Sequence, residues 1–317
     1  MTRPTAELEF VRAPGGRTVL ARSRVRAPLA FTRAFDAGDR SGAAEAWLQS
    51  TSGGLLAGEH VTVRVTAAPG ASVVVAPQSA TVVFAAPGGC SADPVRRPAR
   101  FDLELVVTNG ARLVWSPRPT VLVPGASLRS SIVVRVEAGA SVLVADAYVQ
   151  HRPTGPAGRA IVGWPGDDHV GTGAPAVAAQ PTVGDFGSLD SSVTVEVDGR
   201  LAAGDRQRVR GAWPVPAHGF VWSIGRAAAA SDVSPADDRD AIVAELLAAG
   251  LAAGALPNGA GVGVRAAGRA EEVSGALGAA IAILRGCGRG RGCGRDDCGG
   301  RGDGSGCHGV AAGGLTC

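Results

Sequence analysis

Hydrophobic and polar residues alternate along several short stretches in the first two thirds of the chain. The clearest are residues 61–66 (VTVRVT), 101–107 (FDLELVV) and 131–137 (SIVVRVE), followed later by 192–197 (SVTVEV) and 219–224 (GFVWSI). A period of two places successive side chains on opposite faces of the backbone, so each stretch predicts a strand with one buried face. The pattern therefore favours a β-rich body.

The first three of these strands begin similar units. The units read VTVRVTAAPGASVVVAP, FDLELVVTNGARLVWSP and SIVVRVEAGASVLVAD, with turn glycines at Gly70, Gly110 and Gly139. Glycine suits a turn that needs a positive φ. Such a degenerate repeat predicts strand–turn–strand layers stacked in a β-helix-like or sandwich-like body, although any antiparallel protein contains comparable hairpins.

Helical patterns are confined to the last third. Ser234-Pro235 predicts a helix start, and apolar residues follow it at i, i+4 spacing. A second helix is predicted at about 270–285, with a short strand at 261–265 between the two. We therefore expect a mainly β fold of β-helix-like stacked strands with two C-terminal α-helices.

The chain divides into one expected domain and a tail. Residues 1–285 are predicted to form the β-rich domain, within which 153–190 are rich in Pro, Gly, Ala and Asp and indicate a long loop or insertion. Residues 286–317 are rich in Gly, Arg and Cys, with little apolar content to bury, so we expect them to be disordered.

Composition and charge narrow the class of partner. Of the 317 residues 45% are hydrophobic, which allows a sizeable core, and the formal charge is only +3. All 31 basic residues are arginines scattered along the chain, so neither nucleic acid nor an anionic membrane is an expected partner. With no apolar secretory core near the N-terminus and no stretch able to span a bilayer, the sequence predicts a cytoplasmic protein.

Enzyme signatures are missing from the sequence. It has no GxGxxG after a strand, no phosphate-binding loop and no GxSxG. The lack of lysine removes Schiff-base chemistry, and the five histidines form no HxH or HExxH pair. We therefore expect no catalytic residues.

The tail carries side chains that are weak candidates for metal binding, namely Cys287, Cys293, Cys298, Cys307 and His308. None of the cysteines has the CxxC spacing usual in structural zinc sites. If they bind an ion, thiolate and imidazole suit nickel or zinc. The alternative is a tail without a selected role, typical of GC-rich coding sequence.

Three acidic residues in the body follow apolar or turn segments: Glu59, Asp146 and Asp205. A lone carboxylate in such a place is usually a cap, a turn former or a partner of arginine. The alternative is a polar lining for an internal passage, because hard or borderline divalent ions favour oxygen ligands where only weak contacts are needed.

Five blocks follow one another along the first half of the chain: 8–35 (LEFVRAPGGRTVLARSRVRAPLAFTRAF), 51–59 (TSGGLLAGE), 76–84 (APQSATVVF), 111–128 (ARLVWSPRPTVLVPGASL) and 141–153 (SVLVADAYVQHRP). Together they resemble the urease accessory protein UreD (UreH) family. Thr81, Trp115 and Asp146 match family positions, and Glu59 replaces the usual aspartate. The family's Gly-Glu is Gly155-Pro156 here.

The resemblance implies a non-catalytic scaffold in the maturation of the urease nickel centre. Such a protein bridges urease apoprotein and UreF, which recruits the GTPase UreG. Nickel(II) passes through an interior tunnel in transit, and no cofactor is tightly bound. Glu59, Thr81, Asp146 and Asp205 sit where matching polar residues of the family line that route.

Two other interpretations stay open. The altered Gly-Glu motif is compatible with a degenerate paralogue that binds partners without moving metal. The second interpretation is a carbohydrate-active enzyme with a β-helix fold, which requires two carboxyl groups close together in space. The aromatic content of 4% argues against a sugar-binding groove.

Overall fold

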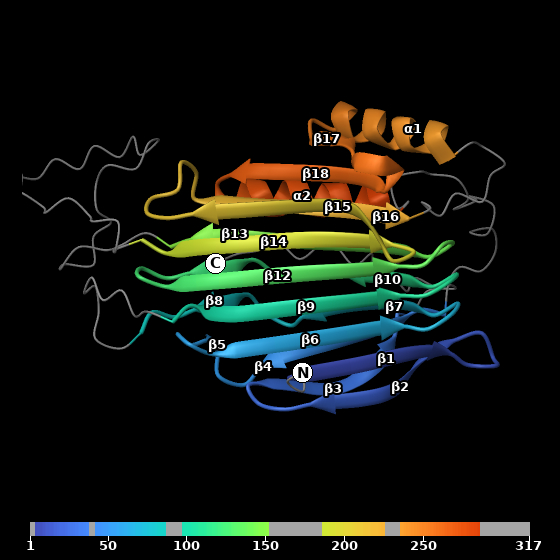
Figure 1. Cartoon of the computed structure of the whole chain (residues 1–317), viewed down its shortest axis with the longest axis horizontal. Coiled ribbons are helices and arrows are strands. Elements are labelled where there is room, and N and C mark those ends of the chain that lie inside the picture. The colour runs from blue at the N-terminus through green and yellow to red at the C-terminus, as the bar shows by residue number, and fades with distance from the viewer. Residues whose placement is uncertain (1–3, 38–41, 87–96, 152–185, 226–234, 286–317) are drawn as a thin grey trace, which may run out of the picture.

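The computed structural model describes residues 4–37, 42–86, 97–151, 186–225 and 235–285. They form two β-sheets that pack face to face, with helices beside one of them (Figure 1). Strand order is β15-β14-β12-β9-β6-β1-β2 in the first sheet, and the main path of the second is β17-β18-β16-β13-β10-β7-β4-β3. The prediction of a mainly β fold with two helices is confirmed.

Three strand–turn–strand units make up the centre of the molecule. Each unit contributes one strand to each sheet: β6 (His60–Ala67) with β7 (Ser72–Pro77), β9 (Ala99–Val107) with β10 (Arg112–Trp115), and β12 (Ser127–Val136) with β13 (Ser141–Gln150). Neighbouring units pair in parallel in both sheets. The repeat seen in the sequence therefore corresponds to stacked layers.

The turn within each layer depends on glycine. Gly70, Gly110 and Gly139 adopt φ values of 71°, 70° and 78°. In this left-handed region a side chain places Cβ too close to the following carbonyl, which costs roughly 1–2 kcal/mol. Glycine avoids this cost and lets each turn repeat the one before it.

Strands that form antiparallel pairs with one another close both ends of the stack. One end holds β1 (Ala6–Arg12), β2 (Thr18–Val25), β3 (Leu29–Asp36) and β4 (Ala44–Ser50). The other holds β14 (Ser188–Val197), β15 (Arg200–Val209), β16 (Ala217–Gly225), β17 (Ala252–Ala255) and β18 (Gly261–Gly268). Three short strands, β5 (Gly54–Leu55), β8 (Thr81–Val83) and β11 (Thr120–Leu122), form a ladder that ends on β13.

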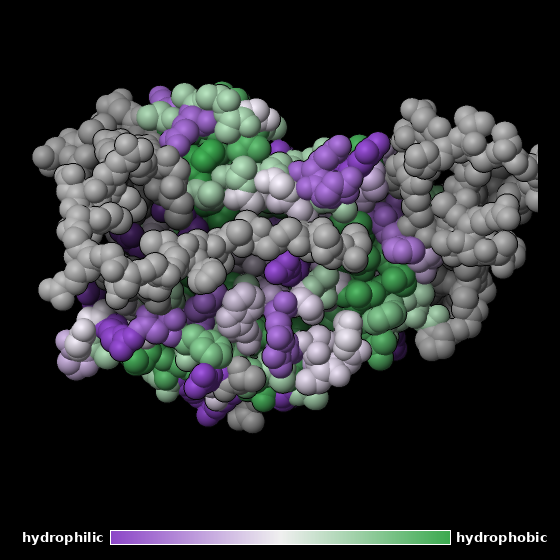
Figure 2. Space-filling model, turned by 180° about the vertical axis from the view of Figure 1, so that it is seen from behind, coloured by the Kyte–Doolittle hydropathy of each residue, from purple (hydrophilic) through white to green (hydrophobic). Residues whose placement is uncertain are grey.

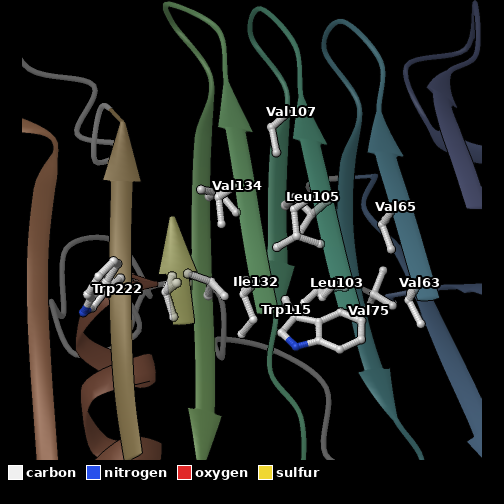
Figure 3. Packing of buried hydrophobic residues seen from close by; sticks show 14 of the residues in the cluster. Val63, Val65, Val75, Leu103, Leu105, Val107, Trp115, Ile132, Val134 and Trp222 are labelled. Atoms are coloured by element: carbon white, nitrogen blue, oxygen red, sulfur yellow. The ribbon is translucent and has the colours of Figure 1, made fainter. Parts of the chain in front are cut away.

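The main core lies between the sheets. Alternation in β6 buries Val63 and Val65, and β9 and β12 likewise bury Leu103 and Ile132. Trp115 from the second sheet packs among these side chains (Figure 3). Because most core residues are Val, Leu and Ala, few large rings are needed to fill the interior.

The helices cover the outer face of the second sheet. In α2 (Ala270–Leu284), Val273 and Leu277 are buried with Val221 and other residues of β13, β16 and β18. Helix α1 (Pro235–Ala248) packs on β17, and a 3-10 helix spans Pro257–Gly259. Leu247 of α1 is exposed. In the view from behind, hydrophobic residues (green) are visible at the upper left, in the region of α1 (Figure 2).

No helix in the described ranges is long and apolar enough to cross a membrane.

Some element boundaries differ from the prediction. Asp146 does not follow an apolar segment at a strand end but lies within β13, which continues to Gln150, and β14 begins at Ser188 instead of 192. Residues 200–209 form strand β15, which was not predicted. Only the last five residues of the expected insertion at 153–190, and none of the tail at 286–317, fall within the part of the chain that the structure describes.

Candidate functional site

A cavity between the sheets brings two of the candidate residues together. Thr81 on β8 and Asp146 on β13 both line it. Its volume is about 60 Å³, enough for a few water molecules at roughly 10–15 Å³ each. The polar part of the lining consists of Gln49, Ser50, Ser79, Thr81, Thr120, Ser130, Asp146 and Tyr148.

The cavity lies in one half of the sandwich. Its walls include Val61 and Val63 from the beginning of β6, Phe101 from the beginning of β9, and Trp115 from the end of β10. The opposite half, next to the glycine turns, is filled by residues such as Leu105, Val107 and Val134 (Figure 3).

Asp146 is the buried polar centre of this cavity. Its Oδ2 accepts a hydrogen bond from the Tyr148 hydroxyl at 2.7 Å, and its Oδ1 accepts one from the Ala147 N–H at 2.9 Å. The Tyr148 hydroxyl also lies 2.9 Å from the Ser191 hydroxyl. Because the tyrosine has one proton and donates it to Asp146, the serine is the donor in that second bond.

Burial changes the protonation of this network. Desolvation raises the pKa of Asp146 from 3.8 to about 6, although the hydrogen bonds from Tyr148 and Ala147 oppose the shift. Burial, together with the neighbouring Asp146 charge, also raises the pKa of Tyr148. A buried carboxylate of this kind is poorly solvated, so an approaching cation would stabilise its charged form.

Glu59 lies outside the cavity lining. It follows the tight turn after β5, where its Oε2 accepts a hydrogen bond from the Leu56 N–H at 2.7 Å. Its backbone carbonyl accepts a bond from the Arg100 N–H at 2.8 Å. In this conformation Glu59 caps the turn that leads from the short ladder into β6.

Asp205 lies at the other end of the stack. It pairs with Val193 in the β14–β15 register and belongs to the same face of β15 as the buried Ala203, so it faces the gap between the sheets. Its Oδ2 lies 2.7 Å from Nη2 of Arg265 on β18. This ion pair connects the edge strand of the first sheet to the second sheet.

A second polar group lies between Asp146 and Asp205 and was not predicted from the sequence. His218 on β16 is the register partner of Tyr148. Its ring centroid lies 5.6 Å from that of Tyr148 and 4.6 Å from that of Trp213. The only signal in the sequence is the alternation His218, Phe220, Trp222 in β16, which places the three side chains on one face.

Gln150, also missed from the sequence, joins the two sheets beside this group. Its side-chain NH2 donates hydrogen bonds to the carbonyls of Gly187 and Gly211 at 2.9 and 2.8 Å. Its side-chain oxygen accepts one from the backbone N–H of Trp213 at 2.9 Å. All three bonds are buried, so the amide is fully used and fixes the loop that carries Trp213.

Within the described ranges, no three His, Cys, Asp or Glu side chains are grouped closely enough to hold a metal ion. Candidates Cys287, Cys293, Cys298, Cys307 and His308 lie outside those ranges.

Comparison with known proteins gives a consistent result. The family model described as UreD urease accessory protein matches residues 3–159. The protein of Methylorubrum populi named urease accessory protein UreD 1 is 32% identical over 302 residues, which cover 91% of each chain. Its namesake from Methylorubrum extorquens is 34% identical over 281 residues, covering 83% of this chain and 80% of the relative.

Proposed function

Because this chain belongs to the UreD family of urease accessory proteins, we propose that it is a scaffold and nickel conduit in the maturation of urease. It binds urease apoprotein and UreF, and through UreF the GTPase UreG. Nickel(II) moves through the interior between the sheets, past Thr81 and Asp146. No cofactor stays bound, and no step requires the chain to act as an enzyme.

The observation that carries this proposal is the position of Asp146. Asp146 is only 6% exposed and lines the cavity. Its hydrogen bonds come from Tyr148 and the Ala147 N–H, and no arginine among the described residues pairs with it. Burying an uncompensated carboxylate is unfavourable, so a purely structural role gives little reason to keep it. A divalent cation passing through the cavity would supply the missing positive charge.

The polar groups also follow the direction of stacking. Thr81 lies on the short ladder, Asp146 on the third layer, and Asp205 on the closing strand at the far end. A conduit needs contacts that are strong enough to admit an ion and weak enough to release it. Single oxygen ligands separated along the interior meet that requirement.

Activation of urease in a reconstituted system tests the proposal. With purified apoprotein, UreF, UreG, GTP and nickel, the variant Asp146→Asn should lower the rate of activation by roughly tenfold or more, as changes around metal ligands commonly do. It should still co-purify with UreF and the apoprotein. Asp190→Asn is the matched control, because Asp190 pairs with Arg206 on the outer face of the first sheet.

Two outcomes decide between the alternatives. Normal activation by Asp146→Asn, and by Asp146→Asn combined with Asp205→Asn, would leave a protein-binding scaffold that does not carry metal. Turnover of a glycan by the purified chain would instead favour a carbohydrate-active enzyme. The described lining of the cavity contains only one carboxylate, Asp146, whereas most glycosidases use two.

A further inference from the structure

His218 is the one histidine of the described core whose buried ring nitrogen has no hydrogen-bond partner. Its Nε2 is shielded from solvent and makes no hydrogen bond to the described residues. The ring packs beside Tyr148 and Trp213. By contrast, His60 on the outer face of β6 is exposed, and its Nε2 lies 2.6 Å from Asp102.

An unsatisfied buried nitrogen weakens the folded state. Leaving such a group without a partner costs free energy, because the nitrogen loses its hydrogen bond to water and gains none in the protein. If His218 served only to fill space beside Trp213, a phenyl ring would pack there without that cost. The retained nitrogen therefore suggests a ligand that is absent from the protein alone.

The imidazole is held in its metal-binding form. Burial, and secondly the charge of Arg265, lower the pKa of His218 to about 4, while Asp205 acts in the opposite direction. The ring is consequently neutral near neutral pH, and neutral imidazole is the form that donates a lone pair to a metal ion.

The position of His218 connects the two carboxylates. On one side it is the register partner of Tyr148, whose hydroxyl bonds to Asp146. On the other side, the charges of Asp205 and Arg265 are near enough to shift the pKa of His218. Arg265 already engages Asp205 at 2.7 Å. Among the described residues, two buried side-chain nitrogens here lack a hydrogen-bond partner, Nε1 of Trp213 and Nε2 of His218. The indole N–H can only donate a hydrogen bond, so His218 is the one of the two that can offer a lone pair to a metal ion.

We propose that His218 is a nitrogen ligand that receives a divalent transition-metal ion between Asp146 and Asp205. The inference rests on the proposed nickel route and adds a transient binding site to it. Imidazole suits nickel(II) better than carboxylate alone does. A single nitrogen beside Asp205 forms an incomplete coordination shell, so the ion is held briefly and passed on.

Nuclear magnetic resonance of histidine side chains tests this directly. The full-length chain, labelled with ¹⁵N-histidine and carrying His308→Ala and serine at Cys287, Cys293, Cys298 and Cys307, is titrated with nickel(II). Paramagnetic nickel broadens the signals of nuclei close to it. The His218 ring signal, assigned with His218→Phe, should disappear at substoichiometric nickel, and the His60 signal should persist.

The variant adds a second readout. His218→Phe should unfold at the same temperature as the parent or at a higher one, and should slow urease activation several-fold. If the His218 signal persists while nickel broadens His60 first, the inference is overturned. If in addition Asp146→Asn still impairs activation, nickel passes through the interior without binding His218. Normal activation by Asp146→Asn and by its combination with Asp205→Asn rejects the route itself.

Discussion

At the scale of single residues, Asp146 differs from the other acidic residues that the structure describes because its carboxylate is buried. Asp190, on the outer face of β14, accepts hydrogen bonds from Arg206 and Arg208, and these lower its pKa to about 2. Asp146 has neutral partners only, and its pKa is raised instead. The two carboxylates therefore respond to pH in opposite ways.

The raised pKa predicts a specific pH dependence of stability. A carboxyl whose pKa rises from 3.8 to about 6 on folding contributes stability that is fully present below about pH 4 and is lost as the pH rises through about 6. Relative to the parent, Asp146→Asn should gain stability as the pH rises from about 4 to about 6.5, by at most about 3 kcal/mol. Thermal unfolding of both proteins across this range measures the gain.

The pH dependence is more informative than the stability at one pH. Asparagine changes the hydrogen bonds to Ala147 and Tyr148 by an amount that does not titrate, so only the slope reports the ionisation of Asp146. A parallel pair of stability curves would show that Asp146 ionises as an exposed carboxylate does. Asp190→Asn should give the opposite slope at lower pH.

Alternation in the sequence indicates which residues of the candidate site share a strand face, but it does not indicate what they contact. Alternation in SVLVADAYVQ indicates that Asp146, Tyr148 and Gln150 share a face. Their partners Ser191 and Trp213 lie 43 and 63 residues further along the chain. Because these contacts depend on how the layers stack, local patterns do not reveal them, and His218 is missed for the same reason.

At the scale of elements, the layer turns and the helices use glycine in different ways. Gly110 adopts φ 70° in the turn between β9 and β10, a conformation that disfavours any side chain. Gly275 lies on the exposed side of α2, where an added Cβ would meet no atom within 4 Å. Position therefore decides whether alanine is harmful or helpful.

We expect Gly110→Ala to lower the free energy of unfolding by about 1–2 kcal/mol, because alanine is strained at positive φ. Gly275→Ala should raise it by about 0.5–1 kcal/mol, since alanine loses less conformational entropy in a helix. Denaturant unfolding of the two variants gives both values. Equal effects of the two substitutions would contradict the assignment of Gly110 to a left-handed turn.

Element prediction succeeds where the local pattern is strong. The three repeated units and both helices follow from periodicity and turn residues. Strand β15 does not, because its sequence RLAAGDRQRV has no alternating apolar face. It is a strand because β14 provides a partner edge, and pairing with a neighbour overrides weak intrinsic preference.

At the scale of the whole molecule, Gln150 links the two sheets at a buried position. Its three hydrogen bonds reach Gly187, Gly211 and Trp213, which belong to segments before β14 and before β16. Removing the amide leaves two carbonyls and one N–H buried without their partner.

Gln150→Ala should therefore lower the free energy of unfolding by roughly 2–4 kcal/mol, given a cost of about 1–3 kcal/mol for each buried group left unsatisfied and partial relaxation around it. Gln207→Ala, on the edge strand β15, is the control and should change it by less than about 1 kcal/mol. Comparable losses in the two variants would show that the Gln150 amide does not hold the sheets together.

The stacked architecture could be predicted from the sequence, but the strands that end the stack could not. Repeated units indicate stacked layers because each unit carries its own turn. Antiparallel strands such as β2 and β15 end the stack, and their place depends on which edges stay open after the layers assemble. That choice involves the whole molecule and has no local signature.

Because both ends of the stack are closed, the number of layers sets the distance between them. Neighbouring strands lie about 4.8 Å apart, so each layer adds one fixed increment to the separation of the two capping hairpins. Duplicating or deleting a unit in frame would move the two ends relative to each other by that increment and leave their own surfaces unchanged. Protein engineers therefore have a stepwise way to vary the spacing between whatever binds at either end.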